Sequence, residues 1–562
     1  MNRRNFLRNC GTGLLAASDL LAKASELECD VAVIGGGTGG FAAALGALRN
    51  GMRVILTEET DWLGGQLTAQ AVPPDENPWI EEFGCTRSYR QYRDSVREYY
   101  RRNYPLTDSA RSRVDLNPGN GSVSRLTHEF RVSVAVLEST LAPWVSSGQL
   151  VVLSGHAPES ATRQGDRVTS VAVRDSRSGR TKTLTAAYFL DATELGELLP
   201  LTGTEFVTGA ESRHETGELH AATEAQPANS QSFTYCFAMD YLEGEDHVTE
   251  RPDDYAFWRD YVPRLAPAWP GKLLSWTYCE PQSLQPVRGY IEPNPGPIKE
   301  FDDLELWTYR RIADRGNFIA GAYRSDITLV NWPQNDFWLG DLVTATPEKK
   351  KELLRSAKQL SLSLLYWMQT EAPRKNGKQG WKGLRLRRDV TGTEDGLGRQ
   401  PYIRESRRIL AEFTVLEKHV GTEMRMKMSG KPHDEVVAER FPDSVGVGAY
   451  RIDLHPSAGG TNYIDISSLP YQIPLGALIP RRVENLLPAC KNLGVTHITN
   501  GCYRLHPVEW SIGEAAGILA GRAVQLRRPP RAIRNDGKLL ADFQQLLVSQ
   551  GFELEWPQIR PL

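Results

Sequence analysis

Apolar residues near the start of the chain form a short run, then a longer helical stretch, then a second short run. Residues 29–34 (CDVAVI) suit a buried parallel strand, residues 38–49 are rich in Ala and Leu, and residues 52–56 (MRVIL) form the second run. Asn50-Gly51 between them is a helix stop signal. A strand, a helix and a strand in so few residues predict a parallel sheet with a right-handed crossover.

Regular patterns continue as far as residue 190. Residues 130–145 are patterned as a helix, and residues 149–153, 168–173 and 184–190 as strands. This order predicts a β-meander that returns to the first sheet. The polar and aromatic residues 73–118 are expected to supply helices and a loop over a site.

A glycine-rich sequence, GGGTGG, joins the first strand to the first helix. Gly35, Gly37 and Gly40 match the GxGxxG spacing, in which the glycines allow a tight turn, backbone approach to a pyrophosphate and close packing of helix on strand. Glu58 ends the second strand, where its carboxylate suits ribose hydroxyls. This context predicts a dinucleotide site; the fingerprint alone leaves FAD and NAD open.

Composition narrows the class of partner. The chain has 562 residues, 66 Lys and Arg against 69 Asp and Glu, and a net charge of −3. Its mean hydropathy is −0.41, and no apolar run reaches the roughly 18–20 residues needed to span a bilayer. We therefore expect a globular protein that binds a small molecule, with neither nucleic acid nor membrane as its main partner.

The cysteines and histidines give no sign of a disulfide framework or a metal site. Seven cysteines are scattered through the chain without a CxxC pair, and the ten histidines show no ligand spacing. We expect packed free thiols and no metal, although the sequence leaves a single cross-bridge open.

The first 24 residues resemble an export signal. Arg3-Arg4-Asn5-Phe6-Leu7 is similar to a twin-arginine motif, an apolar stretch follows at residues 11–21, and Ala22-Lys23-Ala24 suits a cleavage site. This predicts an exported protein, periplasmic or extracellular. Asp19 interrupts the apolar stretch, and if the leader does not function the protein is expected in the cytoplasm.

Later segments carry a family resemblance. Residues 188–197 (YFLDATELGE) resemble the "DATG-D" segment of two-domain flavoproteins, with Glu194 in place of the usual glycine. Residues 62–68 (WLGGQLT), 401–408 (PYIRESRR) and the region 485–517 complete the match. The chain therefore resembles the FAD-dependent oxidoreductase family often found in bacteria, which is related in fold to the glutathione-reductase-like flavoproteins.

The resemblance implies FAD as the cofactor. A helix from Pro507 to about Val524 is expected to point toward the flavin and to stabilise its reduced form. Gly64-Gly65 is expected beside the flavin ring, although it can also be an ordinary turn. The residues expected to hold the cofactor are Gly35, Gly37, Thr38, Gly40, Glu58, Glu59, Gly64, Gly65, Gln66, Asp191, Ala192, Thr193, Asn485 and Gly513.

The predicted fold class is α/β. A Rossmann-type FAD-binding domain with a parallel sheet is expected to carry an inserted α+β substrate domain. The expected parts are the leader at 1–24, the first part of the FAD-binding domain at 25–204, the substrate domain at 205–400, the second part at 401–528, and a helical tail at 529–562.

Hydride transfer to a flavin also requires a base where an O–H or N–H proton leaves the substrate. His506 is the first choice because it precedes the flavin-facing helix, with Tyr503 and Arg504 as orienting groups, and His455 and His497 are the other candidates. One of Arg404, Arg407 and Arg408 is expected to bind an acidic substrate, unless this charged group forms only an internal ion network.

The predicted function is oxidation of a small or medium-sized organic substrate, with electrons passed to oxygen or another acceptor. One alternative is an isomerase, hydratase or lyase that uses FAD without net redox change, and another is a non-catalytic FAD-binding protein. The many aromatic residues between 232 and 338 can stack a sugar or an aromatic ring, or can form a core. Cys85 is a further candidate, as a reactive thiol or a covalent flavin anchor.

Overall fold

A computed structural model describes residues 25–295, 304–557 and 559–562. The proposed leader at 1–24 lies outside these ranges and stays a prediction. Among the described residues, no helix combines the length and the apolar character needed to cross a bilayer.

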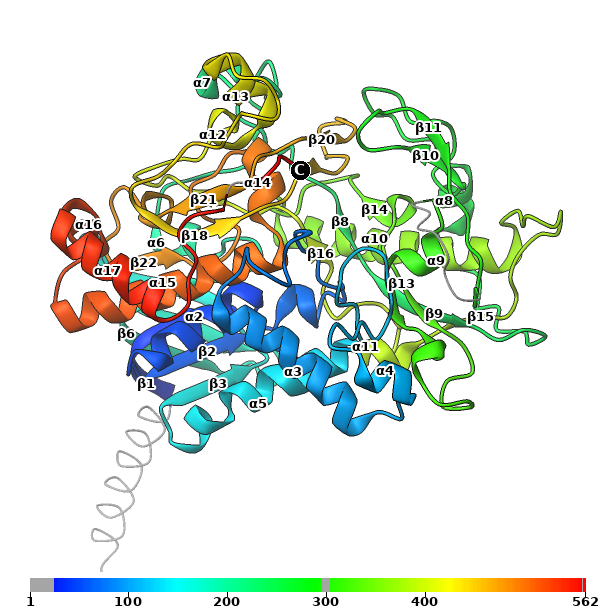
Figure 1. Cartoon of the computed structure of the whole chain (residues 1–562), viewed down its shortest axis with the longest axis horizontal. Coiled ribbons are helices and arrows are strands. Elements are labelled where there is room, and N and C mark those ends of the chain that lie inside the picture. The colour runs from blue at the N-terminus through cyan, green and yellow to red at the C-terminus, as the bar shows by residue number, and fades with distance from the viewer. Residues whose placement is uncertain (1–24, 296–303, 558) are drawn as a thin grey trace, which may run out of the picture.

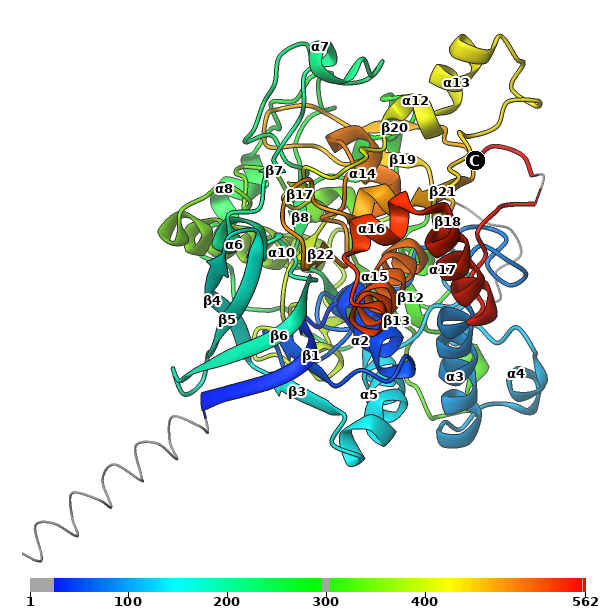
Figure 2. The same ribbon diagram turned by 90° about the vertical axis from the view of Figure 1, so that its left-hand side faces the viewer.

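A seven-stranded sheet organises the amino-terminal part of the chain (Figures 1 and 2). Its order is β3(Leu150–Ser154), β2(Val54–Glu58), β1(Glu26–Ile34), β6(Thr181–Asp191), β5(Arg167–Asp175) and β4(His156–Gln164), and β22(Leu486–Pro488) also pairs with β6. Strands β3, β2, β1, β6 and β22 pair in parallel, whereas β4, β5 and β6 form the antiparallel meander. The α/β class with a parallel-rich sheet is confirmed. The late strand is shorter than the predicted run of residues 483–490.

Two helices pack closely against each other beside this sheet, α2(Thr38–Arg49) and α15(His506–Leu526) (Figure 1). Glycines allow this approach. A Cβ atom added at Gly513 would lie 1.9 Å from the carbonyl oxygen of Gly39, and one at Gly517 would lie 2.0 Å from that of Ala43. The carboxy-terminal segment thus becomes part of the amino-terminal core.

Further helices complete this part of the molecule: α3(Arg87–Asn103), α4(Asp108–Ser112), α5(Phe130–Ser146), α14(His497–Tyr503), α16(Pro530–Asn535) and α17(Gly537–Ser549). Their apolar side chains join those of α2 and α15 in one large core. Two small hairpin-like pairings lie nearby, β18(Ser444–Gly448) with β21(Tyr471–Pro474) and β19(Ile452–Leu454) with β20(Ile464–Ile466).

The remaining part has its own core, rich in tryptophan. It contains the sheet β12(Arg311–Ala313), β13(Ile327–Val330), β9(Phe237–Tyr241) and β15(Leu384–Leu386), with the long helix α10(Pro347–Thr370), and these elements gather on the right of Figure 1. A second small sheet joins β14(Asp336–Phe337), β8(Phe233–Thr234) and β16(Tyr402–Ile403). Strand β16 therefore pairs with the predicted substrate domain, although it lies just beyond the boundary placed at residue 400.

Candidate functional site

The first glycine turn is held tightly against the end of β6. Gly35 has φ +102°, and an added Cβ would lie 2.3 Å from the carbonyl oxygen of Ala192. A Cβ at Gly40 would lie 1.9 Å from the carbonyl oxygen of Gly35. These contacts are those expected of the tight turn and of the packing glycine in the fingerprint. Helix α2 begins directly after Gly37, so its amino-terminal N–H groups face the turn.

A second glycine turn lies against the first. Gly64 donates its N–H to the carbonyl of Gly36 at 2.8 Å, and the Thr38 hydroxyl donates to the carbonyl of Gly64 at 2.9 Å. Gly64 and Gly65 have φ +110° and +50°, and a Cβ at Gly65 would lie 2.8 Å from the Cα of Gly37. Residues 35–40 and 64–66 thus form one backbone surface.

Glu58 ends β2 beside these turns. Its Oε2 accepts from the N–H of Gly36 at 3.1 Å, and its Oε1 accepts from the N–H and the hydroxyl of Thr60 at 2.8 Å. Burial raises the pKa of this carboxyl to about 7. The neighbouring Glu59 accepts from the amide of Gln400 at 2.9 Å.

These groups line a narrow cavity. Its walls include the first glycine turn, Glu58, Glu59, Ala192, Thr193 and Gln400. A glycine turn after a strand, a helix amino-terminus and a carboxylate at the end of the next strand are what the adenosine and pyrophosphate part of a dinucleotide requires. The residues present therefore fit that part of FAD.

Asp191 supports this cavity from behind. Its Oδ1 accepts from the N–H of Thr193 at 3.0 Å and from the Thr193 hydroxyl at 2.6 Å, which fixes the turn after β6. Burial raises the pKa of Asp191 to about 7. Asp191 is not among the residues that line the cavity, whereas Ala192 and Thr193 are.

A chain of buried charges leads away from the glycine turns. Lys491 Nζ lies 2.5 Å from Glu194 Oε2 and 3.5 Å from Glu509 Oε1, and Gln66 donates to Glu509 at 2.5 Å and to the carbonyl of Arg504 at 3.0 Å. Burial disfavours the cation, but Glu194 and Glu509 raise the pKa of Lys491. Lys491 and Glu509 could not be predicted from the sequence, because only the fold brings them to Gln66.

Arg504 reaches a second, larger cavity of about 500 Å³. Three residues that the sequence predicted for the active site line it: Arg404, His455 and Arg504. Asp453, which was not predicted, lines it as well. The segment that forms β16 connects the two cavities, because Gln400 lines the narrow one and Tyr402 and Arg404 line the large one. The large cavity has the size of a small-molecule site.

His455 is held in this cavity by a buried carboxylate. Its Nδ1 lies 2.6 Å from Oδ2 of Asp336, which is wholly buried, and Asp336 Oδ1 lies 3.0 Å from the Arg404 guanidinium. Burial opposes ionisation of Asp336, but Arg404 and His455 outweigh it and lower the pKa of this carboxyl. With Nδ1–H donated to Asp336, the neutral ring carries its lone pair on Nε2.

Asp453 lies on the other side of His455. Its Oδ2 is 3.6 Å from Nε2 of His455 and 3.1 Å from Arg504, which also donates to the Tyr402 hydroxyl at 2.8 Å. Burial again opposes ionisation, but His455 and Arg504 lower the pKa of Asp453. An imidazolium at position 455 would thus have a carboxylate beside each nitrogen.

His506 and Tyr503 are placed differently from the sequence prediction. His506 is wholly buried, does not line the large cavity, and accepts from the N–H of Asp75 through Nδ1 at 3.0 Å. Burial lowers its pKa to about 3, so it is poorly suited to take a proton. The Tyr503 hydroxyl donates to the carbonyl of Gln472 at 2.7 Å, away from the cavity. Both residues support the fold, whereas His455 lines the large cavity.

Asn485 and Gly513 also have structural contacts in place of the expected cofactor contacts. The Asn485 amide donates to the carbonyls of Val168 and Ala187 and accepts from the N–H of Val168, so it joins β22 to the meander. Gly513 packs on α2, as described above. Arg404 is the only arginine of residues 404–408 that lines the large cavity; Arg408 pairs with Glu405 and Glu211 in an internal network.

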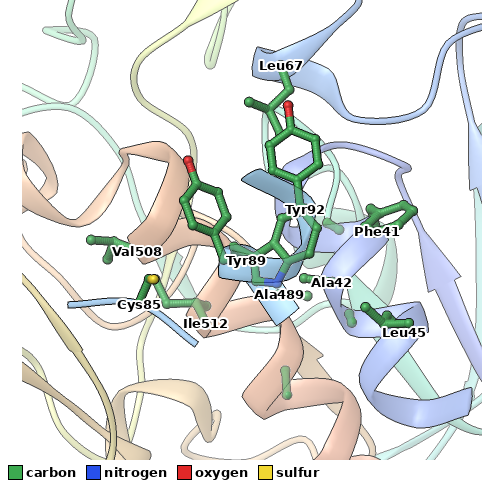
Figure 3. Packing of buried hydrophobic residues seen from close by; sticks show 14 of the residues in the cluster. Phe41, Ala42, Leu45, Leu67, Cys85, Tyr89, Tyr92, Ala489, Val508 and Ile512 are labelled. Carbon is green, nitrogen blue, oxygen red and sulfur yellow. The ribbon is translucent and has the colours of Figure 1, made fainter. Parts of the chain in front are cut away.

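Cys85 belongs to the apolar core. Figure 3 shows its sulfur beside Val508 and Ile512. Burial raises the pKa of its thiol to about 12, so the thiolate is scarce at neutral pH. This placement argues against a reactive thiol or a covalent anchor. The six cysteines in the described part of the chain are buried and free.

Comparison with known proteins gives one extensive match. The sequence profile described as "FAD dependent oxidoreductase" matches residues 30–547, which is most of the chain. No curated protein sequence matches.

Solved structures match only in part. The L-proline dehydrogenase from P. horikoshii is 16% identical over 33% of this chain and 24% of its own, with a TM-score of 0.16. The myxobacterial chondrochloren halogenase CndH is 14% identical over 40% and 45%, with a TM-score of 0.22. The flavin-dependent monooxygenase PieE is 14% identical over 38% and 35%, with a TM-score of 0.21. The match thus spans about a quarter of the proline dehydrogenase and less than half of the other two.

Proposed function

Because the chain belongs to the family of FAD-dependent oxidoreductases, we propose that it oxidises a small polar organic substrate in the large cavity, with His455 as the base. One observation carries this proposal: His455 lines that cavity, and a wholly buried carboxylate holds its Nδ1. The Nδ1–H bond to Asp336 orients the ring, and in the neutral form it leaves the lone pair on Nε2, as a general base needs.

The protein's own groups suit FAD in the narrow cavity. Glu58 would accept hydrogen bonds from the ribose hydroxyls, and the start of α2 would face the pyrophosphate. Gly64 and Gly65 leave backbone surface beside that position. Gln66 bonds to the carbonyl of Arg504 and so connects the cofactor loop to the large cavity.

In the proposed reaction the substrate loses a hydride from a C–H bond and a proton from a neighbouring O–H or N–H bond. Each goes to a different acceptor. A bound flavin supplies the two-electron acceptor that takes the hydride from carbon. The proton of the neighbouring hydroxyl or amine passes to Nε2 of His455, and a carbonyl or imine is left. Asp336 and Asp453 then stabilise the imidazolium, because their oxygens lie 2.6 and 3.6 Å from its two nitrogens.

The test is anaerobic reduction of the flavin by a candidate substrate, followed by absorbance. His455→Asn keeps an N–H donor toward Asp336 but removes the base, and we expect reduction at least about a hundredfold slower with an unchanged FAD content. His433→Asn, at an exposed position, is the matched control. Equal rates for His455→Asn and wild type would contradict the role of His455.

The same experiment separates the rival functions. Conversion of a substrate without flavin reduction would indicate an isomerase, hydratase or lyase that uses FAD without net redox change. A bound flavin that no substrate reduces, in a protein that converts no substrate, would indicate a non-catalytic FAD-binding protein.

A further inference from the structure

The large cavity has an aromatic lining. Six aromatic side chains line it, and the structure places them on several segments of both parts of the molecule: Tyr278, Tyr309, Trp332, Tyr402, Tyr450 and Tyr463. The Arg404 guanidinium lies over the Tyr402 ring at 4.8 Å, and Arg310 over Tyr309 at 5.0 Å. Rings fixed in this way offer flat apolar faces with polar edges.

The arginines of the cavity are all paired with carboxylates. Four arginines and five carboxylates line it. Each arginine already has a carboxylate within ion-pair distance: Arg310 has Asp75 at 3.3 Å, Arg404 has Asp336 at 3.0 Å, Arg451 has Asp465 at 2.5 Å, and Arg504 has Asp453 at 3.1 Å. A ligand carboxylate would therefore meet no unpaired cation, so the lining disfavours an acidic substrate.

The same lining holds buried polar atoms without partners. Within the described part of the chain, six lining residues each have one such atom: Nε of Arg310, Arg404 and Arg504, Nδ2 of Asn331, Nε1 of Trp332 and the Tyr463 hydroxyl. Five of these atoms are obligate donors. Buried polar groups are normally hydrogen-bonded, so these donors suit a ligand rich in acceptor oxygens better than an apolar one.

Tyr463 lies beside the proposed base, His455. Its ring centroid lies 5.4 Å from that of His455 in an edge-on arrangement, its side chain is 4% exposed, and its hydroxyl has no partner. A ligand hydroxyl is both donor and acceptor, so it can accept from an arginine N–H and donate to the carboxylate that pairs with that arginine. Adjacent hydroxyls on a ligand ring can bond in this way to several arginine–carboxylate pairs of the large cavity.

We propose that the substrate is a neutral carbohydrate, a polyhydroxylated ring whose C–H face packs on the aromatic side chains while its hydroxyls bond to the paired arginines and carboxylates. This inference rests on the proposed function for the identity of the reacting cavity. It differs from the sequence expectation that Arg404 binds an acidic group, because Arg404 is already paired with Asp336.

Binding is tested on the FAD-loaded protein without turnover. Saturation-transfer NMR or calorimetry is run under anaerobic conditions with a panel of neutral methyl glycosides, their uronic acid counterparts and aryl alcohols of similar size. We expect one or more neutral glycosides to bind, and Tyr463→Phe to weaken that binding about five- to tenfold through loss of one hydrogen bond.

Controls keep the binding experiment decisive. Tyr366→Phe removes a hydroxyl from α10, away from the cavity, and should leave glycoside binding unchanged. Trp332→Phe provides a second cavity variant, which keeps an aromatic ring and loses an N–H. Binding of uronates or aryl alcohols alone, binding of no panel member, or equal binding by wild type and both cavity variants would overturn the inference.

The two proposals fail in different ways. Glycosides that bind but never reduce the flavin would leave the ligand class standing and overturn the proposed oxidation. Flavin reduction by a non-carbohydrate substrate, with a rate that depends on His455, would do the reverse.

Discussion

At the scale of single residues, buried carboxylates do most to define the two cavities. Asp336 and Asp453 are held ionised by arginine and histidine neighbours, whereas burial raises the pKa of Glu58 and Asp191 to about 7. The first pair holds His455 beside the large cavity, and the second pair shapes the narrow cavity. Whether a buried carboxyl in this protein is ionised therefore depends on the charges of its neighbours.

Asp191 gives a pH-dependent prediction. Because its pKa is raised in the folded state, its contribution to stability is fully present below about pH 4 and is lost as the pH rises through 7. Asp191→Asn lacks this dependence. Between pH 5 and pH 8.5 the stability of the variant relative to wild type should rise by roughly 2–3 kcal/mol. Thermal melting at both pH values measures this change, and a pH-independent difference would contradict it.

The glycine turn gives a second prediction. Gly35→Ala would add a Cβ 2.3 Å from the carbonyl of Ala192 at a positive φ, so the turn must shift and FAD content should fall strongly. Gly148 also has a positive φ, +75°, but an added Cβ there meets no atom within 4 Å. Gly148→Ala should therefore keep its FAD. Equal FAD content in the two purified variants, measured by absorbance, would count against a cofactor role for the turn.

The positions of residues could be predicted from sequence where they depend on local spacing. Gly35, Gly40 and Glu58 lie within one strand–helix–strand unit, and the structure places each as the fingerprint requires. The choice among histidines could not be made in this way. His455 is distinguished from His506 by its bond to Asp336, which is 119 positions away in the chain. Only the folded arrangement contains that information.

At the scale of elements, α15 could be predicted from the sequence, whereas the longer helix α10, Pro347–Thr370, was not predicted. The helix expected from Pro507 to about Val524 is α15, His506–Leu526, with the proline in its first turn. Its contacts were not predicted: Gly513 was expected to hold the cofactor, whereas Gly513 and Gly517 meet α2. Short strands were harder, because β16 has two residues and owes its existence to pairing with β8.

Helix packing can be tested with two alanines in α15. Gly513→Ala would place a Cβ 1.9 Å from a backbone oxygen of α2, so the helices must separate and the melting temperature should fall. In Gly521→Ala the nearest atom is the flexible Met52 side chain at 3.3 Å. That variant should be neutral or stabilised by up to about 1 kcal/mol through helix propensity. A loss of stability of equal size in both variants would show that close packing on α2 is not the cause.

At the scale of the whole molecule, two cores meet around the cavities. One core includes the helices on the main sheet and the other the tryptophan-rich part, and residues from both line the large cavity. The sequence predicted a cofactor domain and an inserted part from motif order. It could not predict the large cavity, whose walls come from distant segments.

Cofactor binding should stabilise the whole molecule. FAD added to the apoprotein should raise its melting temperature, with about 2.7 kcal/mol expected at a hundredfold excess over the dissociation constant. FMN is the matched control, because it lacks the adenosine part that suits Glu58 and the first glycine turn. An equal shift with FMN would contradict the assignment of the narrow cavity.

Gln400, Tyr402 and Arg404 lie in one short segment that lines both cavities. A ligand that shifts this segment in one cavity must alter the affinity of the other cavity for its own ligand. Thermodynamic linkage makes that effect equal in both directions. If the substrate binds the oxidised and reduced holoproteins with different affinities, it therefore changes the reduction potential of the flavin, so the driving force for electron transfer depends on whether the second cavity is filled.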